Sequence, residues 1–153
     1  MNLNKADEAV ACFNDGFNCS QAIFSTYCDE LGLDKETALK IACGLGGGMG
    51  GMQGTCGAVS GAYLLIGLKY GYFLKEDKAI KGKIYAVIRK FAALFEERNK
   101  TTSCRELLGV DFVNDDKQIT MERIKTVCPK VIRDAAEIIE QMLFSDEAER
   151  INS

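Results

Sequence analysis

Histidine is absent from the 153 residues of the chain. Without imidazole there is no Ser/His or Cys/His catalytic pair, no haem held by histidine and no mixed Cys/His zinc site. Proline occurs once, and no two cysteines stand in a CxxC pair. A thioredoxin-type dithiol motif is therefore excluded as well.

A strong excess of charge of either sign is also lacking, since 19 basic residues stand against 22 acidic ones for a net charge of −3. A nucleic acid or an anionic membrane is therefore not an expected partner. The first eight residues are polar and charged and lack the apolar run of a signal peptide. We expect a cytoplasmic protein, in whose reducing surroundings structural disulfides are disfavoured.

The longest uncharged stretch runs from Ile41 to Leu68 and has 28 residues, enough to be tested as a membrane span. Seven of the eleven residues from Gly44 to Gly54 are glycine. The densely apolar part, residues 58–68, is well short of the ~20 residues that a span needs. This stretch therefore predicts a buried core helix, and the chain is not expected to be embedded in a membrane.

Helical periodicity covers most of the chain, and the alternation typical of strands is sparse. The sequence predicts an all-α fold: a compact multi-helix bundle with a glycine-rich loop before a central uncharged helix. The expected helices cover residues 5–14, 19–31, 35–45 and 56–70, a long amphipathic stretch from 80, a short helix from 104, a turn at 120–125 and a last helix over 129–144. No repeat or linker interrupts the chain, which indicates a single domain over residues 1–153.

Gly57 and Gly61 lie four residues apart on the central helix, so one side of that helix has no side chains at these positions. Another helix backbone can approach closely there. The approaching helix can belong to this chain or to the second subunit of a homodimer.

Cysteine is the abundant reactive residue, with seven copies: Cys12, Cys19, Cys28, Cys43, Cys56, Cys104 and Cys128. An odd number disfavours a closed set of disulfides. Cys12, Cys28 and Cys43 fall inside or near the ends of predicted helices. Core packing is the ordinary role of a free cysteine at such positions.

The other four cysteines are predicted at helix starts. Residues 18–21 and 103–106 each have the pattern of a capping box, which puts Cys19 and Cys104 in a first turn. Cys56 follows the glycine tract at the start of the central helix. Cys128 precedes a proline, whose missing N–H suits the first helical position, so Cys128 is expected to be a cap. Because the helix dipole and free amides stabilise a thiolate there, these four are predicted to be the redox-active thiols.

The residues around these cysteines also resemble a known family. The segment Cys56-Gly57-Ala58-Val59-Ser60-Gly61, with Cys19 upstream and Cys104 and Cys128 downstream, is similar to the C_GCAxxG_C_C family of redox-active proteins. The resemblance covers nearly the whole chain. It implies a small cytoplasmic redox-active protein, and these four cysteines match those that the family shares. It also implies a relation to an iron–sulfur domain of split-Soret cytochromes, work beside a transporter, and selenocysteine in the motif of some members.

Three functions remain open at this point. In the first, the four helix-start cysteines are thiolate ligands of a metal centre, iron–sulfur or zinc, used for electron transfer with an unknown redox partner. The backbone of Gly54 and Gly57 would then approach the centre beside Cys56. In the second, the chain is a metal-free thiol/disulfide oxidoreductase in which Cys56 attacks the substrate and another of the four cysteines resolves the mixed disulfide. In the third, it is a non-enzymatic helical interaction module.

Overall fold

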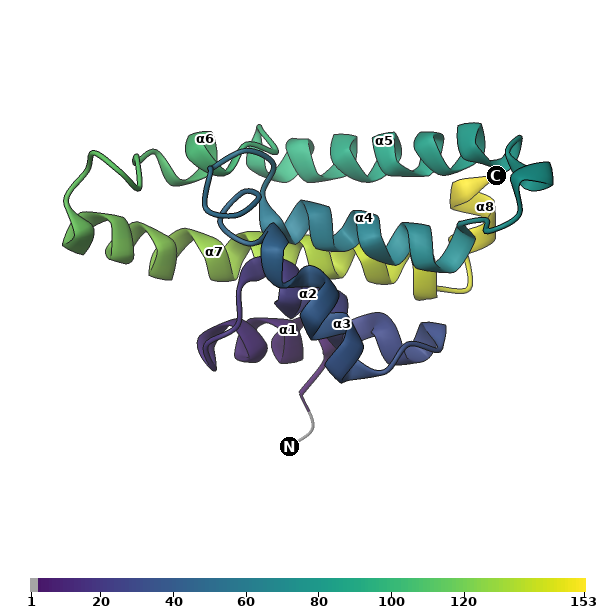
Figure 1. Ribbon diagram of the computed structural model, residues 1–153, viewed down its shortest axis with the longest axis horizontal. Helices are drawn as coiled ribbons and strands as arrows, with labels where there is room; N and C mark the ends of the chain where they lie inside the picture. The colour runs from purple at the N-terminus through teal and green to yellow at the C-terminus, as the bar shows by residue number, and fades with distance from the viewer. Residues whose placement is uncertain (1–2) are drawn as a thin grey trace.

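Helices make up all the regular structure of residues 3–153, the part of the chain that this computed structural model describes. The predicted all-α fold is confirmed. Figure 1 shows the helices, joined by loops and by short 3₁₀ and π turns. Their bounds are α1 Lys5–Asn14, α2 Cys19–Tyr27, α3 Lys35–Ala42, α4 Gly57–Tyr70, α5 Ile80–Asn99, α6 Cys104–Leu108, α7 Lys117–Ile139 and α8 Ala148–Asn152.

Three long helices, α4, α5 and α7, run along the long axis of the molecule and pack against one another (Figure 1). The first three helices cover one side of this group: α1 contacts α2 and α7, and α2 contacts α4 and α3. The short α6 packs against α7, and α8 packs against the π turn Glu140–Phe144. One cluster of buried side chains includes residues from α1 to α7.

The innermost helix is α4, because its sequence carries no charge before Lys69. Leu65 and Ile66 are fully buried. Gly57 and Gly61 face α2 closely: a Cβ built on Gly61 would lie 2.9 Å from the Ser20 carbonyl oxygen. The predicted close approach is confirmed, and the helix that covers the glycine face is α2 of the same chain.

The helix α7 differs most from the prediction. The sequence predicts a turn at 120–125 and a separate helix from Pro129, whereas the structure has one helix of 23 residues with Pro129 inside it. It begins at the Asp116 cap, whose side chain accepts hydrogen bonds from two amides of the first turn. Burial of its apolar face on both sides of the proline offsets the hydrogen bond that the proline removes. The prediction that Cys128 is a helix cap is therefore wrong.

The glycine tract forms an ordered loop closed by its own backbone. The Gln53 N–H donates to the Gly47 carbonyl over 2.9 Å, and the Gly54 N–H donates to the Gly48 carbonyl over 2.7 Å. Gly47 and Gly48 have φ values of 61° and 70°, which side-chain-bearing residues rarely adopt. These turns bring the chain back so that Cys56 stands directly at the start of α4.

Within residues 3–153, no helix combines the length and the apolar character needed to cross a membrane. This agrees with the prediction that residues 41–68 do not form a span.

Candidate functional site

The first residue of α2 is Cys19, and a complete capping box fixes its position. The Asn18 side chain accepts a hydrogen bond from the Gln21 N–H (2.9 Å), and the Gln21 side chain accepts one from the Asn18 N–H (3.0 Å). Asn18 also donates through its amide nitrogen to the Cys43 carbonyl over 2.9 Å, which ties the helix start to the beginning of the glycine tract. The capping box predicted at residues 18–21 is confirmed. The one predicted at 103–106 is only half formed: the Ser103 side chain accepts from the Glu106 N–H (3.2 Å), but the Ser103 N–H donates to the Thr101 hydroxyl (3.0 Å).

Cys56 and Cys104 are brought together by an isolated antiparallel bridge between their segments. The Cys56 N–H donates to the Thr102 carbonyl (2.8 Å), and the Cys104 N–H donates to the Gly54 carbonyl (2.7 Å). Cys56 is the N-cap of α4, and Cys104 is the first residue of α6, whose N-cap is Ser103. The prediction that both cysteines stand at helix starts is confirmed.

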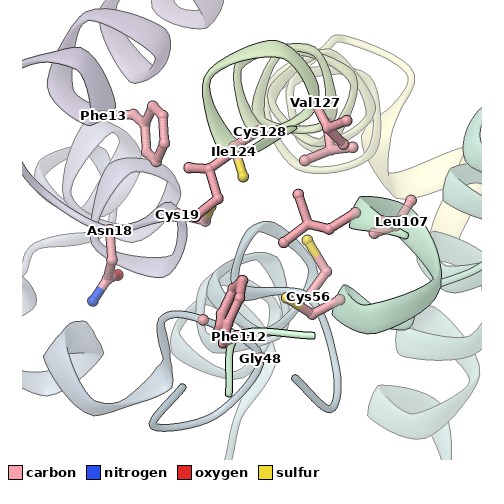
Figure 2. Close-up of a pocket in the computed structure, with 15 residues that line it drawn as sticks. Phe13, Asn18, Cys19, Gly48, Cys56, Leu107, Phe112, Ile124, Val127 and Cys128 are labelled. Atoms are coloured by element: carbon pink, nitrogen blue, oxygen red, sulfur yellow. The ribbon is translucent and has the colours of Figure 1, made fainter. Parts of the chain in front are cut away.

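The four predicted cysteines, Cys19, Cys56, Cys104 and Cys128, line one cavity of about 200 Å³. Figure 2 shows Cys19, Cys56 and Cys128 around it, with Phe13 and Phe112 among the side chains of its wall. The apolar part of the lining comprises Phe13, Leu107, Leu108, Phe112, Ile124, Val127 and Val131. Each of the four cysteines is only 4% to 8% exposed. The site is therefore an apolar chamber, partly open to solvent, whose reactive groups are buried thiols.

The Cys19 and Cys128 thiols are neighbours in the cavity lining, close enough to influence each other's ionisation. This proximity, together with burial, raises the pKa of Cys19 well above its usual value. The same proximity lowers the pKa of Cys128 despite its burial. Since Cys128 lies in the middle of α7, the lowering comes from the neighbouring thiol and not from a helix start.

Cys56 and Cys104 do not have the lowered pKa that is expected for a thiol at a helix start. Burial raises the pKa of Cys56 to about 12, although the nearby backbone N–H groups of Ala58 and Val59 oppose this rise. Burial raises the pKa of Cys104 to about 11. The apolar chamber therefore keeps both thiols protonated near neutral pH when no metal is bound.

A sequence model of one family matches residues 17–142, a range that contains all four cavity cysteines. The family is described as "Putative redox-active protein (C_GCAxxG_C_C)". The chain belongs to the C_GCAxxG_C_C family. A search of curated proteins and a search of solved structures gave no match. Membership of the C_GCAxxG_C_C family makes this a redox-active class of protein, and its description names neither a metal nor a substrate.

Two glycines of this C_GCAxxG_C_C member bring backbone close to its cysteines. A Cβ built on Gly57 would lie 3.0 Å from the Cys19 Cβ, and one built on Gly48 would lie 2.7 Å from the Cys104 Cβ. Gly54 is predicted to contact a cofactor through its backbone. In the structure its N–H donates to a carbonyl within the glycine loop, and its carbonyl accepts from the Cys104 N–H. The backbone amides of Ala58 and Val59, at the start of α4, lie near the Cys56 sulfur.

The three remaining cysteines of this C_GCAxxG_C_C member lie outside the cavity lining. Cys28 is fully buried, and its thiol donates to the Ser25 carbonyl over 3.5 Å, as expected for a packing residue. Cys12 is half-buried, with its sulfur 3.8 Å from the Ser25 hydroxyl. Cys43 is exposed, so the expectation of core packing is wrong for this residue. It lies just beyond α3, on the outer side of the turn into the glycine loop.

Two residues of the site were not predicted from the sequence. Gln53 is 6% exposed, and its side chain donates to the Val110 carbonyl (2.8 Å) and accepts from the Phe112 N–H (2.9 Å). Phe112 then places its ring in the cavity wall (Figure 2). The φ of 59° at Gln53 marks a position that the fold constrains, and this is visible in the structure and not in the sequence.

The four thiols surround the cavity without meeting at one point. Within residues 3–153, no three histidine, cysteine, aspartate or glutamate side chains are placed to bind a single metal ion. A group held by all four sulfurs must therefore extend across the chamber, or the chamber must contract around it.

Proposed function

We propose that the chain is an electron-transfer protein in which Cys19, Cys56, Cys104 and Cys128 hold an iron–sulfur cluster. The observation that carries this proposal is the placement of four thiols, from four separate segments, in the wall of one apolar cavity of about 200 Å³. Four cysteine ligands are the common donor set for such clusters. The donor set and the chamber therefore fit the group.

A cluster and a single ion differ in the spacing that they require of four thiols. In a tetrahedral zinc site with Zn–S bonds of ~2.3 Å, the four sulfurs lie about 3.8 Å apart. No three metal-binding side chains of residues 3–153 are arranged for one ion. A cluster of several iron and sulfide atoms is larger, so its cysteine ligands stand farther apart around it.

The surrounding residues suit a buried redox centre. When bound, the cluster would supply one-electron transfer, and its potential would respond to hydrogen bonds on the sulfurs and to exposure to solvent. The backbone amides of Ala58 and Val59 lie near the Cys56 sulfur and favour its ionised form. The aromatic rings of Phe13 and Phe112 belong to a wall that keeps water away from the thiols.

Iron, zinc and acid-labile sulfide per chain, measured on protein purified without oxygen, test the proposal. We expect stoichiometric iron and sulfide, and we expect that replacing any one of the four cavity cysteines with alanine lowers both. Cys28→Ala is the matched control, because Cys28 is buried but lies outside the cavity lining, and it should keep the iron. Stoichiometric zinc, or an absence of iron after anaerobic reconstitution, would reject the cluster.

The proximity of Cys19 and Cys128 favours a second function, metal-free thiol/disulfide exchange. In this reaction the Cys128 thiolate attacks a substrate disulfide, forms a mixed disulfide and releases one substrate thiol. The Cys19 sulfur then attacks the Cys128 sulfur and releases the second thiol. The substrate is reduced, and the chain is oxidised to a Cys19–Cys128 disulfide. The attacking sulfur proposed here is that of Cys128, in place of the Cys56 sulfur that the sequence favours.

Reduction of a small disulfide such as oxidised glutathione by metal-free protein tests this second function, with a dithiol reductant added to return the Cys19–Cys128 disulfide to thiols after each turnover. We expect Cys128→Ser to abolish turnover and Cys56→Ser to keep most of it. The reverse pattern would restore Cys56 as the nucleophile.

A further inference from the structure

The four cavity thiols are nearly inaccessible, with exposed fractions of 4% to 8%. Any chemistry on them that involves an outside molecule, whether a disulfide, an alkylating reagent or the components of a cluster, requires an entry path. Movement of part of the cavity wall would widen this path. Differences in tethering among the wall segments indicate which part moves most readily.

Residues 111–116, which we call the flap, form several hydrogen bonds among themselves, and Phe112 is the flap residue that lines the cavity. The Asp111 side chain accepts from the Val113 N–H over 2.8 Å, and the Asp115 side chain accepts from the Asp111 N–H over 2.7 Å. The Asp115 N–H also donates to the Asp111 carbonyl over 2.9 Å. Because these bonds stay inside the flap, it can move as one unit.

The flap is bordered by points where the chain can turn. On one side Gly109, with a φ of 67°, ends α6. On the other side Asp116 caps the first turn of α7. Val110, the residue directly before the flap, is buried and anchors the chain there. Rotation about these borders would carry Phe112 out of the cavity wall.

Gln53 provides the main connection between the flap and the glycine loop. Its side chain donates to the carbonyl of Val110, directly before the flap, and accepts from the N–H of Phe112, within the flap. Its own backbone N–H is held by Gly47, so the glutamine is fixed on the loop side. The other tie is an ion pair of 2.9 Å between Arg105 and Asp111, in which Arg105 is exposed and the pair is correspondingly weak.

We propose that the flap is the gate of the thiol cavity and that the Gln53 side chain latches it closed. With both hydrogen bonds made, the Phe112 ring shields the thiols; with both broken, the flap swings away and the cavity opens. The gate controls access to the thiols, so it operates for a cluster protein and for a thiol/disulfide exchanger alike. Gln53 is a positioning residue, since it acts through Phe112 and does not touch the sulfurs.

Alkylation of the reduced, metal-free protein by iodoacetamide, with each cysteine followed by mass spectrometry, tests the gate. Gln53→Met keeps the length of the side chain and removes both hydrogen bonds. We expect the cavity cysteines to be alkylated roughly tenfold faster than in the wild type, the change that the loss of two ordinary hydrogen bonds gives. Gln141→Met, at an exposed position on the far side of the fold from Gln53, should leave the rates unchanged.

Two cysteines of the same chain serve as internal standards. Cys43 is exposed and should react rapidly in both proteins, whereas Cys28 is fully buried away from the cavity and should stay slow in both. Unchanged rates at the cavity cysteines would overturn the proposal. So would a parallel rise at Cys28, because it would mean that the whole fold opens.

A measurement on the wild type covers the case in which Gln53→Met does not fold. The gate predicts that the Phe112 N–H exchanges with solvent through local opening, faster than the Leu65 N–H in the middle of α4. Equal exchange rates for these two amides would show that the flap opens only when the protein unfolds, and the proposal would fail.

Discussion

Gly57 and Gly61 lie at the contact between α4 and α2, and the absence of a side chain at these positions sets the distance between the two helices. A Cβ on Gly61 would lie 2.9 Å from the Ser20 carbonyl oxygen and 3.1 Å from the Ile23 Cβ. Neither neighbour is the mobile end of a side chain. Because α2 carries Cys19 at its first position, the same contact also sets where this thiol stands in the cavity.

We therefore expect Gly61→Ala to lower the free energy of unfolding by about 1–3 kcal/mol, the usual cost of overpacking a tight contact. Gly67→Ala is the matched control in the same helix, since a Cβ on Gly67 meets nothing within 4 Å. It should raise stability by about 0.5–1 kcal/mol, because alanine is the better helix former. Urea denaturation of the reduced proteins measures both. A stable Gly61→Ala protein would show that α2 moves away freely.

The capping residues could be predicted from sequence, but the thiol acidities could not. Asn18 and Gln21 contact each other within one turn, so their pattern is local and is confirmed. The pKa of Cys128 depends on Cys19, a residue far away in the chain. At Cys56, burial exceeds the effect of the helix-start amides, and the extent of burial is decided by the packing of other helices.

Among the helices, α7 is the one whose start was predicted at the wrong residue, because of a single proline. Pro129 looks like the first residue of a helix, since its missing N–H is harmless there. In the structure it lies inside α7, where the Lys125 carbonyl has no helical N–H to accept from. Lys125 is exposed, so water can reach this part of the helix. The proline therefore lowers the stability of the helix only moderately, and tertiary packing of the apolar face keeps α7 continuous across it.

Pro129→Ala restores the missing donor and relaxes the residue before it, Cys128. We expect the free energy of unfolding to rise by about 1–3 kcal/mol, as measured by urea denaturation. Lys125→Ala, at an exposed position of the same helix, should change it by no more than about 0.5 kcal/mol. If Pro129→Ala were neutral or destabilising, the packing around Cys128 would require the shape that the proline imposes.

Helix bounds were predictable wherever the chain carries local signals. α1 covers the expected residues 5–14, and α3 begins after the Asp34 cap. The glycine tract carried no such signal for its internal bonds, because its path depends on backbone hydrogen bonds that many glycine conformations could make. The contact of Gln53 with Phe112 joins two loops distant in sequence, and periodicity says nothing about such pairs.

In the folded molecule, the cavity exists only because α2, α4, α6 and α7 meet at one end of the bundle. The sequence could nominate four cysteines by their type and local position. It could not show that they share a chamber, since that depends on the helix packing as a whole. The same packing removes the thiols from water, which makes the fold itself sensitive to their ionisation.

The stability of the reduced, metal-free protein should therefore fall at alkaline pH. Cys56 has a pKa of about 12 in the folded chain and an ordinary value of 9.0 when exposed, so the fold favours its neutral form. Its contribution is fully present below pH 9 and is lost as the pH rises from 9 towards 12. Cys104, at about 11, acts in the same direction over a narrower range.

Comparing Cys56→Ser with the wild type isolates the contribution of this thiol, because lysines and tyrosines titrate alike in both proteins. Between pH 9 and 11 the wild type should lose up to about 1.4 kcal/mol per pH unit more than the variant. Urea denaturation at a series of pH values measures the difference. Parallel pH profiles would mean that the Cys56 thiol ionises as readily in the folded chain as in water, and hence that the chamber is open to solvent in the absence of metal.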